Sequence, residues 1–206
     1  MAAGAFFQDG SKKRAAEAVK AVEAKTSAEV VIAVRRSSGD YRAADYLFGI
    51  ACGTVVVLLL YFLPQSFDPR TMPVDGVLVT LVGVLASANL PPLRRVLVLA
   101  KTRAEHVTTA ARAAFYDLGI SKTQGRSGIL VYVSVFEKRA CVVPDVGVDP
   151  AKLGDAWRTA VESIDDAAAR LDFDAFLAAV EKLGPVLAPT MPRAADDVNE
   201  LPDEVA

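Results

Sequence analysis

The sequence predicts an α/β domain, a small mixed sheet flanked by helices, that is interrupted by a two-helix transmembrane hairpin. Two long stretches without a charged side chain, residues 46–63 and 76–93, indicate the hairpin. Three short segments rich in β-branched residues, separated by amphipathic helical patterns, indicate the sheet and its helices. Because one of these segments precedes the hairpin and two follow it, we expect the domain to need both flanks of the hairpin to fold.

The composition narrows the chemistry that the chain can perform. Of its 206 residues 52% are hydrophobic, and the formal net charge is −2. The absence of a basic cluster argues against nucleic acid as a partner. One histidine, His106, excludes multi-histidine metal sites and leaves a Ser-His-Asp triad one possible base. Two cysteines without a CxxC motif build neither a disulfide framework nor a zinc site.

The two apolar stretches differ in strength as membrane spans. The first, residues 46–63, approaches the length of a bilayer's hydrocarbon core and carries Tyr46 and Tyr61 near its ends. The second, residues 76–93, is weaker because Asn89 and two following prolines interrupt its C-terminal end. A pair of buried core helices is the alternative. A helix that is apolar on all sides must lie in lipid or inside a large protein, and this chain is small, so the membrane is favoured.

The distribution of arginine and lysine around the hairpin predicts its orientation. The connection between the two stretches carries only Arg70, whereas cations flank both stretches on their outer sides. The positive-inside rule then places both termini in the cytoplasm, and no cleaved signal peptide is apparent. The outer cations are Arg35, Arg36, Arg42, Arg94, Arg95, Lys101 and Arg103.

Residues 1–45 form the first part of the α/β domain. Asp9 or Ser11 can cap a helix that extends to about Lys25, and the segment AEVVIAVRRSS follows as a buried strand. The hairpin occupies residues 46–93.

Residues 94–188 form the second part. A long helix runs from Leu97 to Leu118, and GILVYVSV and RACVV are two strands joined by the turn 136–139. Asp149 then opens a helix, and Asp172 opens another that ends near Gly184 and Pro185. Residues 189–206 contain five acidic side chains, one arginine and three prolines, which predicts a disordered acidic tail.

Several of these segments resemble a known family. The stretches EAKTSAEVVIAVRRSSGDYR and AFYDLGISKTQGRSGILVYVSVFEKRACVVPDVGV, with the tryptophan helix that follows, are similar to the TPM domain. The similarity is closest to bacterial membrane-anchored members, in which a two-span hairpin interrupts the domain, and it covers roughly residues 10–185. The resemblance implies a mixed sheet flanked by helices, a multi-pass protein of the bacterial inner membrane, and a part in membrane-complex assembly or repair, calcium binding or acid phosphatase activity.

One predicted site is the turn between the last two strands. If the first strand and GILVYVSV are parallel, this turn points toward the membrane, because the first strand ends eight residues before Tyr46. Phe136, Lys138 and Arg139 then contact the lipid headgroups. An ordinary exposed turn is the alternative.

The same geometry gathers a second candidate cluster at the opposite, cytoplasm-facing end of the sheet. Its carboxylates could hold a divalent cation, calcium or magnesium, and its arginine an anion. The cluster consists of Thr123, Arg126, Asp145 and Asp149. A helix N-cap for Asp149, a turn residue for Asp145 and a loop cap for Arg126 are the structural alternatives.

Asp40 and Tyr41 form a weaker candidate pair, for which a loop leading into the first span is the alternative. His106 has no serine or cysteine with an evident reason to lie within hydrogen-bond reach, so we expect a surface or boundary residue. Packing accounts for Cys52 and Cys141.

These observations favour a non-enzymatic adaptor, or an assembly and maintenance factor, for membrane protein complexes, with its α/β domain on the cytoplasmic side. Its partners would be the lipid bilayer and other membrane proteins, and a homo-oligomer is compatible with the sequence. The alternative is a metal-assisted phosphatase that uses Asp145 and Asp149. A channel subunit would need oligomers, since two spans enclose no pore, and neither stretch contains an ionisable residue.

Overall fold

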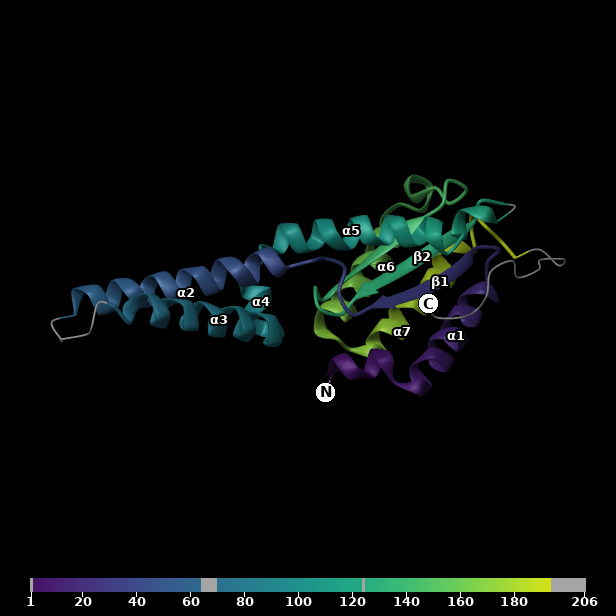
Figure 1. Ribbon diagram of the computed structural model, residues 1–206. Helices are drawn as coiled ribbons and strands as arrows, with labels where there is room; N and C mark the ends of the chain where they lie inside the picture. Colours follow the sequence, from purple (N-terminus) through teal and green to yellow (C-terminus); the bar gives the residue numbers. More distant parts are fainter. Residues whose placement is uncertain (1, 64–69, 124, 194–206) are drawn as a thin grey trace. The chain divides into compact units, whose positions relative to one another are not determined.

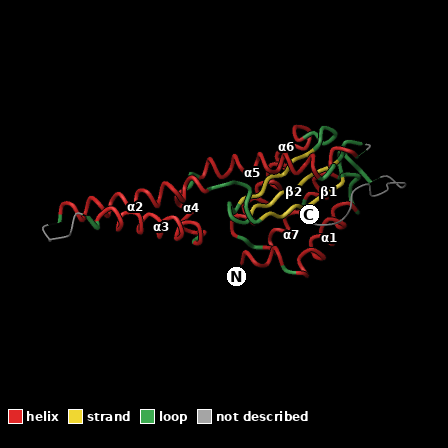
Figure 2. The backbone as a smooth tube through the Cα atoms, in the orientation of Figure 1, coloured by secondary structure: helices red, strands yellow, loops and turns green. Residues whose placement is uncertain are grey.

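The computed structural model describes residues 2–63, 70–123 and 125–193. The chain divides into two compact units, Met1–Ser38 together with Ala104–Ala206, and Gly39–Arg103. We name them the α/β unit and the helical unit (Figure 1, Figure 2). The helical unit therefore interrupts an α/β unit that is assembled from both ends of the chain.

A three-stranded mixed sheet forms the centre of the α/β unit. Its order is β1 (Glu29–Arg35), β2 (Gly128–Ser134) and β3 (Arg139–Pro144). β1 and β2 are parallel and β2 and β3 antiparallel, which confirms the predicted mixed sheet. Arg35 lies opposite Ser134, so the parallel strands end at the same end of the sheet, where the turn to β3 begins.

Helices cover both faces of this sheet. α5 (Ala100–Asp117) packs on one face, where Val107, Ala111 and Phe115 meet Val31, Leu130 and Tyr132. The opposite face meets α1 (Asp9–Glu23) and α6 (Pro150–Arg170), followed by α7 (Phe173–Glu181) and α8 (Leu183–Leu187). Successive strand residues alternate between these two cores, as the period of a strand requires. Residues of β1 and β2 are apolar on both faces because both faces are buried.

The N-terminal ends of three helices show which of the predicted residues act as caps. Asp149 accepts a hydrogen bond from the backbone N of Ala151 and caps α6, and Asp172 caps α7 through the N of Ala175, both at 3.0 Å. At α1, by contrast, Gln8 occupies the N-cap without a side-chain bond, and the Ser11 hydroxyl donates to the carbonyl of Ala5.

The helices differ from the sequence prediction at three points. Leu97 ends α4 (Pro91–Leu97), so the long helix begins only at Ala100. Gly154 has a φ of +61° inside α6 and kinks it. The helix opened by Asp172 ends at Glu181, and residues 183–187 form α8, which contains Gly184 and Pro185. Short 3-10 helices, Ala2–Phe7 and Ile120–Lys122, complete the described elements.

The start of the predicted acidic tail is ordered. The Met191 carbonyl accepts hydrogen bonds from the Thr26 hydroxyl at 2.6 Å and from the Ser27 backbone N at 3.1 Å, and Pro192 forms an isolated bridge with Thr26. Disorder is therefore the wrong prediction for residues 189–193, because these backbone bonds tie them to the segment before β1. The prediction for residues 194–206 lies outside the described residues.

In the helical unit, α2 (Arg42–Phe62) and α3 (Met72–Asn89) pack closely against each other. Glycines permit this contact, because a Cβ on Gly53 would lie 2.1 Å from the Oγ1 of Thr80 and 2.6 Å from the carbonyl O of Gly76. Both helices are long and apolar enough to cross a membrane, with mean hydropathies of 2.0 and 1.5. α3 ends at Asn89, before the predicted 93, because Pro91 lacks a backbone donor and starts α4.

Candidate functional site

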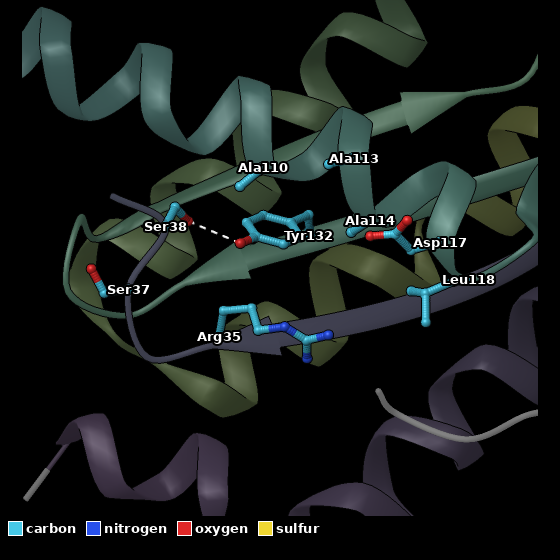
Figure 3. Close-up of a pocket in the computed structure, with 9 residues that line it drawn as sticks. All are labelled: Arg35, Ser37, Ser38, Ala110, Ala113, Ala114, Asp117, Leu118 and Tyr132. Carbon is cyan, nitrogen blue, oxygen red and sulfur yellow. Dashed lines mark hydrogen bonds between the residues drawn. The ribbon is translucent and has the colours of Figure 1, made fainter. Parts of the chain in front are cut away.

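A cavity of about 280 Å³ lies between α5 and the end of the sheet at which β1 and β2 stop (Figure 3). The small side chains of α5 leave this space open beside Tyr132. Its lining is formed on the helix side by Ala110, Ala113, Ala114, Asp117 and Leu118, and on the sheet side by Arg35, Ser37, Ser38 and Tyr132. We name this space the α5–β1 pocket.

A buried carboxylate organises the sheet side of the pocket. Glu137, in the turn between β2 and β3, is only 2% exposed. Its Oε1 accepts hydrogen bonds from the backbone N of Ser38 at 2.9 Å and from the Ser37 hydroxyl at 3.2 Å, and its Oε2 accepts one from the Ser134 hydroxyl. The segment that leaves β1 is therefore held against the β2–β3 turn.

The hydroxyl of Ser38 connects this carboxylate to the pocket. Ser38 Oγ donates to Ser134 Oγ at 2.7 Å and lies 2.9 Å from the Oη of Tyr132 (Figure 3). Tyr132 is 2% exposed and stands on β2, where its ring contributes to the core beneath α5. Four side chains thus form a continuous chain of hydrogen bonds from Glu137 to the pocket wall.

The pocket also carries two opposite charges. Arg35 stands at the exposed C-terminal end of β1, and its Nη1 donates to the neighbouring Val34 carbonyl at 3.3 Å. Asp117 stands at the C-terminal end of α5 and is exposed. Among the described residues no hydrogen-bond or ion-pair partner of Asp117 is present, so its carboxylate is available to a ligand.

The turn predicted to contact headgroups is placed at the same end of the sheet. Phe136 and Lys138 are half-buried, and Lys138 has a φ of +53°. Arg139 is exposed, but its Nε lies 3.1 Å from Oδ1 of Asp165 on α6. Only part of this turn's apolar and cationic surface is therefore available to a membrane.

In the predicted cluster, Arg126 and Asp145 pair with each other, and Thr123 bonds to the backbone of its own loop. Arg126 places Nη2 2.8 Å from Oδ1 and Nε 2.8 Å from Oδ2 of Asp145, whose side chain is 2% exposed. This hydrogen bond raises the pKa of the Arg126 guanidinium, which therefore keeps its proton. Thr123 Oγ1 accepts from the Ser127 backbone N at 3.1 Å. Gly147 packs against this loop, since its added Cβ would lie 2.4 Å from the Gly125 carbonyl O.

Asp149 does not join this cluster as a second metal ligand. It caps α6, and its Oδ2 lies 3.7 Å from the Nζ of Lys152. In the parts of the chain that the structure describes, no three His, Cys, Asp or Glu side chains are grouped so that they could hold a metal ion. The arrangement is that of an ion pair and a helix cap.

Asp40 and Tyr41 lie at the start of α2. Asp40 Oδ1 accepts from the Arg42 backbone N at 3.0 Å, and the Tyr41 carbonyl accepts from the backbone N of Ala44 at the same distance. Both residues thus shape the entry to the helix. Of the remaining residues that the sequence singled out, His106 is half-buried on α5, and burial raises the pKa of the Cys141 thiol on β3.

A buried ion pair in the helical unit was missed. Asp45 accepts from the Ser87 hydroxyl at 2.6 Å, from Arg94 Nε at 2.9 Å and from Arg94 Nη2 at 2.5 Å. It joins α2, α3 and α4 near the end of α3. The available signal in the sequence was an aspartate directly before the first apolar stretch and an arginine directly after the second.

Glu137 and the α5–β1 pocket were also missed. A glutamate between an aromatic residue and two cations is typical of an exposed turn, and its partners Ser37 and Ser38 lie about a hundred positions away. The only signal was the SS pair that follows a buried strand after one intervening residue, Arg36.

Comparison with known proteins supports the fold. No family model matches the chain, and no curated protein matches it. Among solved structures the chain is similar to the NMR structure of the BA42 protein from the psychrophilic bacterium Bizionia argentinensis sp. nov.. The TM-score is 0.58 and the identity 18%, over 97% of this chain and 93% of that chain. At this identity the likeness shows a shared fold alone.

Proposed function

We propose that this chain is a membrane-anchored, non-enzymatic adaptor of the TPM-domain type in the bacterial inner membrane. The helical unit spans the bilayer twice, both termini lie in the cytoplasm, and the α/β unit serves as an assembly or maintenance factor for other membrane proteins. The resemblance of residues 10–185 to the bacterial membrane-anchored TPM subgroup supports this assignment.

The observation that carries the proposal is the exposed apolar surface of α2 and α3. Only 17% of each helix's most apolar window is buried. Leu47 on α2 is 68% exposed and Val82 on α3 is 65% exposed. A core helix of a soluble protein would bury such residues, and continuous apolar surface of this extent favours lipid.

The charges agree with two spans. Asp45, the buried acid near the start of α2, is neutralised by Arg94, and buried charges next to a bilayer require such pairing. Arg70 is the one cation in the connection between the spans, and the other flanking cations lie on the outer sides.

The engaged carboxylates favour an adaptor over a phosphatase. Asp145 is held by Arg126, and Asp149 caps α6, so neither has a free pair of oxygens for a hard cation. The loop after β3 instead presents Val146, which is 79% exposed and offers an apolar contact for a partner.

Cysteine accessibility tests the topology. Thr71→Cys precedes α3 in the connection, and Lys152→Cys lies on the exposed side of α6; both are made in a chain with Cys52 and Cys141 replaced by alanine. In intact spheroplasts a membrane-impermeant maleimide should label Thr71→Cys alone, and in inside-out vesicles Lys152→Cys alone. Equal labelling of both from one side would contradict two spans, and the reverse pattern would contradict a cytoplasmic α/β unit.

Crosslinking tests the adaptor role. A photoreactive amino acid at Val146 should give a discrete adduct with a membrane protein in cells, and the same group at Glu17, exposed on α1, should not. Indistinguishable adducts at both positions would contradict a specific partner surface. Turnover of an aryl phosphate with magnesium or calcium that is lost in Asp149→Ser, which retains an N-cap oxygen, would favour the phosphatase.

A further inference from the structure

The segment that follows α3 has an inverted distribution of exposed side chains. Within residues 90–99 every exposed residue is apolar, whereas Arg94 and Arg95 are half-buried. Val96 is 84% exposed and Leu99 is 75% exposed. A surface helix of a water-soluble domain shows the opposite distribution, with its charges outward and its apolar side chains inward. The outer surface of this segment therefore suits an apolar environment. Its exposed residues are Leu90, Pro91, Pro92, Val96 and Leu99.

The buried ion pair of the helical unit fixes the orientation of α4. Arg94 donates to both carboxylate oxygens of Asp45, and the Ser87 hydroxyl donates to the same carboxylate. Asp45 lies in the first turn of α2 and Ser87 in the last turn of α3, so α4 is tied to the end of the hairpin opposite to its connection (Figure 1). Val96, two positions after Arg94, lies about 200° around the helix axis and therefore faces away from the hairpin.

The length of α3 determines where this segment lies in a bilayer. α3 has 18 residues, which at 1.5 Å per residue span about 27 Å. The hydrocarbon core of a bilayer is about 30 Å thick. A hairpin that crosses the bilayer therefore leaves the hydrocarbon close to Asn89. Pro91, which lacks a backbone donor, starts α4 at this boundary.

We propose that residues 90–99 form an in-plane membrane segment, which lies on the cytoplasmic leaflet and inserts its exposed apolar side chains at the boundary between headgroups and acyl chains. The partner of this surface is the lipid bilayer, and Val96 and Leu99 make the deepest contacts. Asp45 and Arg94 are positioning residues that hold α4 at this depth. The inference rests on the proposed two spans and adds to them a contact that runs parallel to the membrane plane.

Fluorescence quenching at different depths tests the proposal. Single cysteines that carry a small environment-sensitive fluorophore are placed in a full chain whose two native cysteines are replaced by alanine, and each chain is reconstituted in vesicles of phosphatidylethanolamine and phosphatidylglycerol. The quenchers are a nitroxide on the acyl chain near the headgroup, a nitroxide near the end of the acyl chain, and iodide in the water. The labelled positions are Val96→Cys, Leu99→Cys, Val82→Cys and Lys152→Cys.

Each position has a distinct expected result. Val96→Cys and Leu99→Cys should lose more fluorescence with the shallow nitroxide than with the deep one or with iodide. Val82→Cys, near the middle of α3, should lose most with the deep nitroxide. Lys152→Cys is the water-exposed control, since the Lys152 side chain is 76% exposed on α6, and iodide alone should quench it.

The outcomes separate this proposal from the two spans. Quenching of Val96→Cys and Leu99→Cys by iodide alone, with Val82→Cys quenched by the deep nitroxide, would overturn the in-plane segment and leave the spans intact. Quenching of Val82→Cys by iodide alone would contradict the spans themselves.

Arg94→Gln tests the positioning role. Without the ion pair α4 should move away from the hairpin, so Val96→Cys should lose shallow quenching and gain iodide quenching, while quenching of Val82→Cys is unchanged. Arg42→Gln is the matched control, because it removes an exposed cation from the first turn of α2 outside the buried pair. Equal quenching of Val96→Cys in the parent chain and in Arg94→Gln would overturn the role of the ion pair.

Discussion

Replacing Glu137 by alanine should strongly destabilise the α/β unit. The change removes three accepted hydrogen bonds from a residue that is 2% exposed. The Ser38 backbone N–H and the fully buried Ser134 hydroxyl lose their acceptor, whereas Ser37 is exposed and can turn to water. Two orphaned groups, one buried at Ser134 and one partly buried at Ser38, at about 1–3 kcal/mol each give a loss of about 2–6 kcal/mol.

This loss is a large fraction of the stability of an ordinary domain, about 5–15 kcal/mol. Urea unfolding of the full chain in detergent measures this loss through the fluorescence of Trp157, which is buried in the core between the sheet and α1 and α6. With a slope of about 2 kcal/mol per molar urea, the midpoint should fall by about 1–3 M. Glu17→Ala, an exposed glutamate on α1, is the control and should leave the midpoint unchanged. An equal midpoint for Glu137→Ala and Glu17→Ala would refute the proposed role of the carboxylate.

Three shorter predictions concern other contacts. Gly147→Ala should lower the urea midpoint by the equivalent of about 1–3 kcal/mol, because its Cβ meets backbone oxygens, whereas Gly125→Ala, whose Cβ lies 3.5 Å from the nearest atom, should not. Arg94→Gln should destabilise the helical unit by about 1–3 kcal/mol and lower the temperature at which the protein precipitates from detergent, and adding Asp45→Asn should recover part of the loss. Burial raises the pKa of Cys141, so the folded state holds the thiol proton more tightly than the unfolded state. Stability should therefore fall as the pH rises above the usual thiol pKa of about 8.5. Alkylation of Cys141 in a Cys52→Ala chain should be slow until urea is added.

Local rules were sufficient for the sheet and for several helix ends. The segments that became β1, β2 and β3 are rich in β-branched residues. The last two pair in the antiparallel sense across a four-residue turn, as the spacing predicted. Asp149 and Asp172 became caps because a short carboxylate before a helix can reach the free N–H groups of the first turn. These features depend on residues close in sequence.

The missed side-chain contacts depend on residues distant in sequence. Asp45 meets Arg94 across 49 positions. Glu137 meets Ser38 across 99 positions. The first pair forms only after α2 packs against α3 and α4, and the second only after β1 pairs with β2, so no local pattern distinguishes these residues from surface residues.

Replacing Glu137 by glutamine should separate the loss of hydrogen-bond partners from the loss of the carboxylate. The glutamine oxygen can still accept from the Ser38 backbone N–H, and its NH2 group can donate to Ser134, which then donates to Ser38. The groups that Glu137→Ala leaves without an acceptor therefore keep a partner, and Glu137→Gln should retain most of the urea midpoint. A midpoint for Glu137→Gln as low as that of Glu137→Ala would contradict the assignment of the loss to orphaned hydrogen-bond groups.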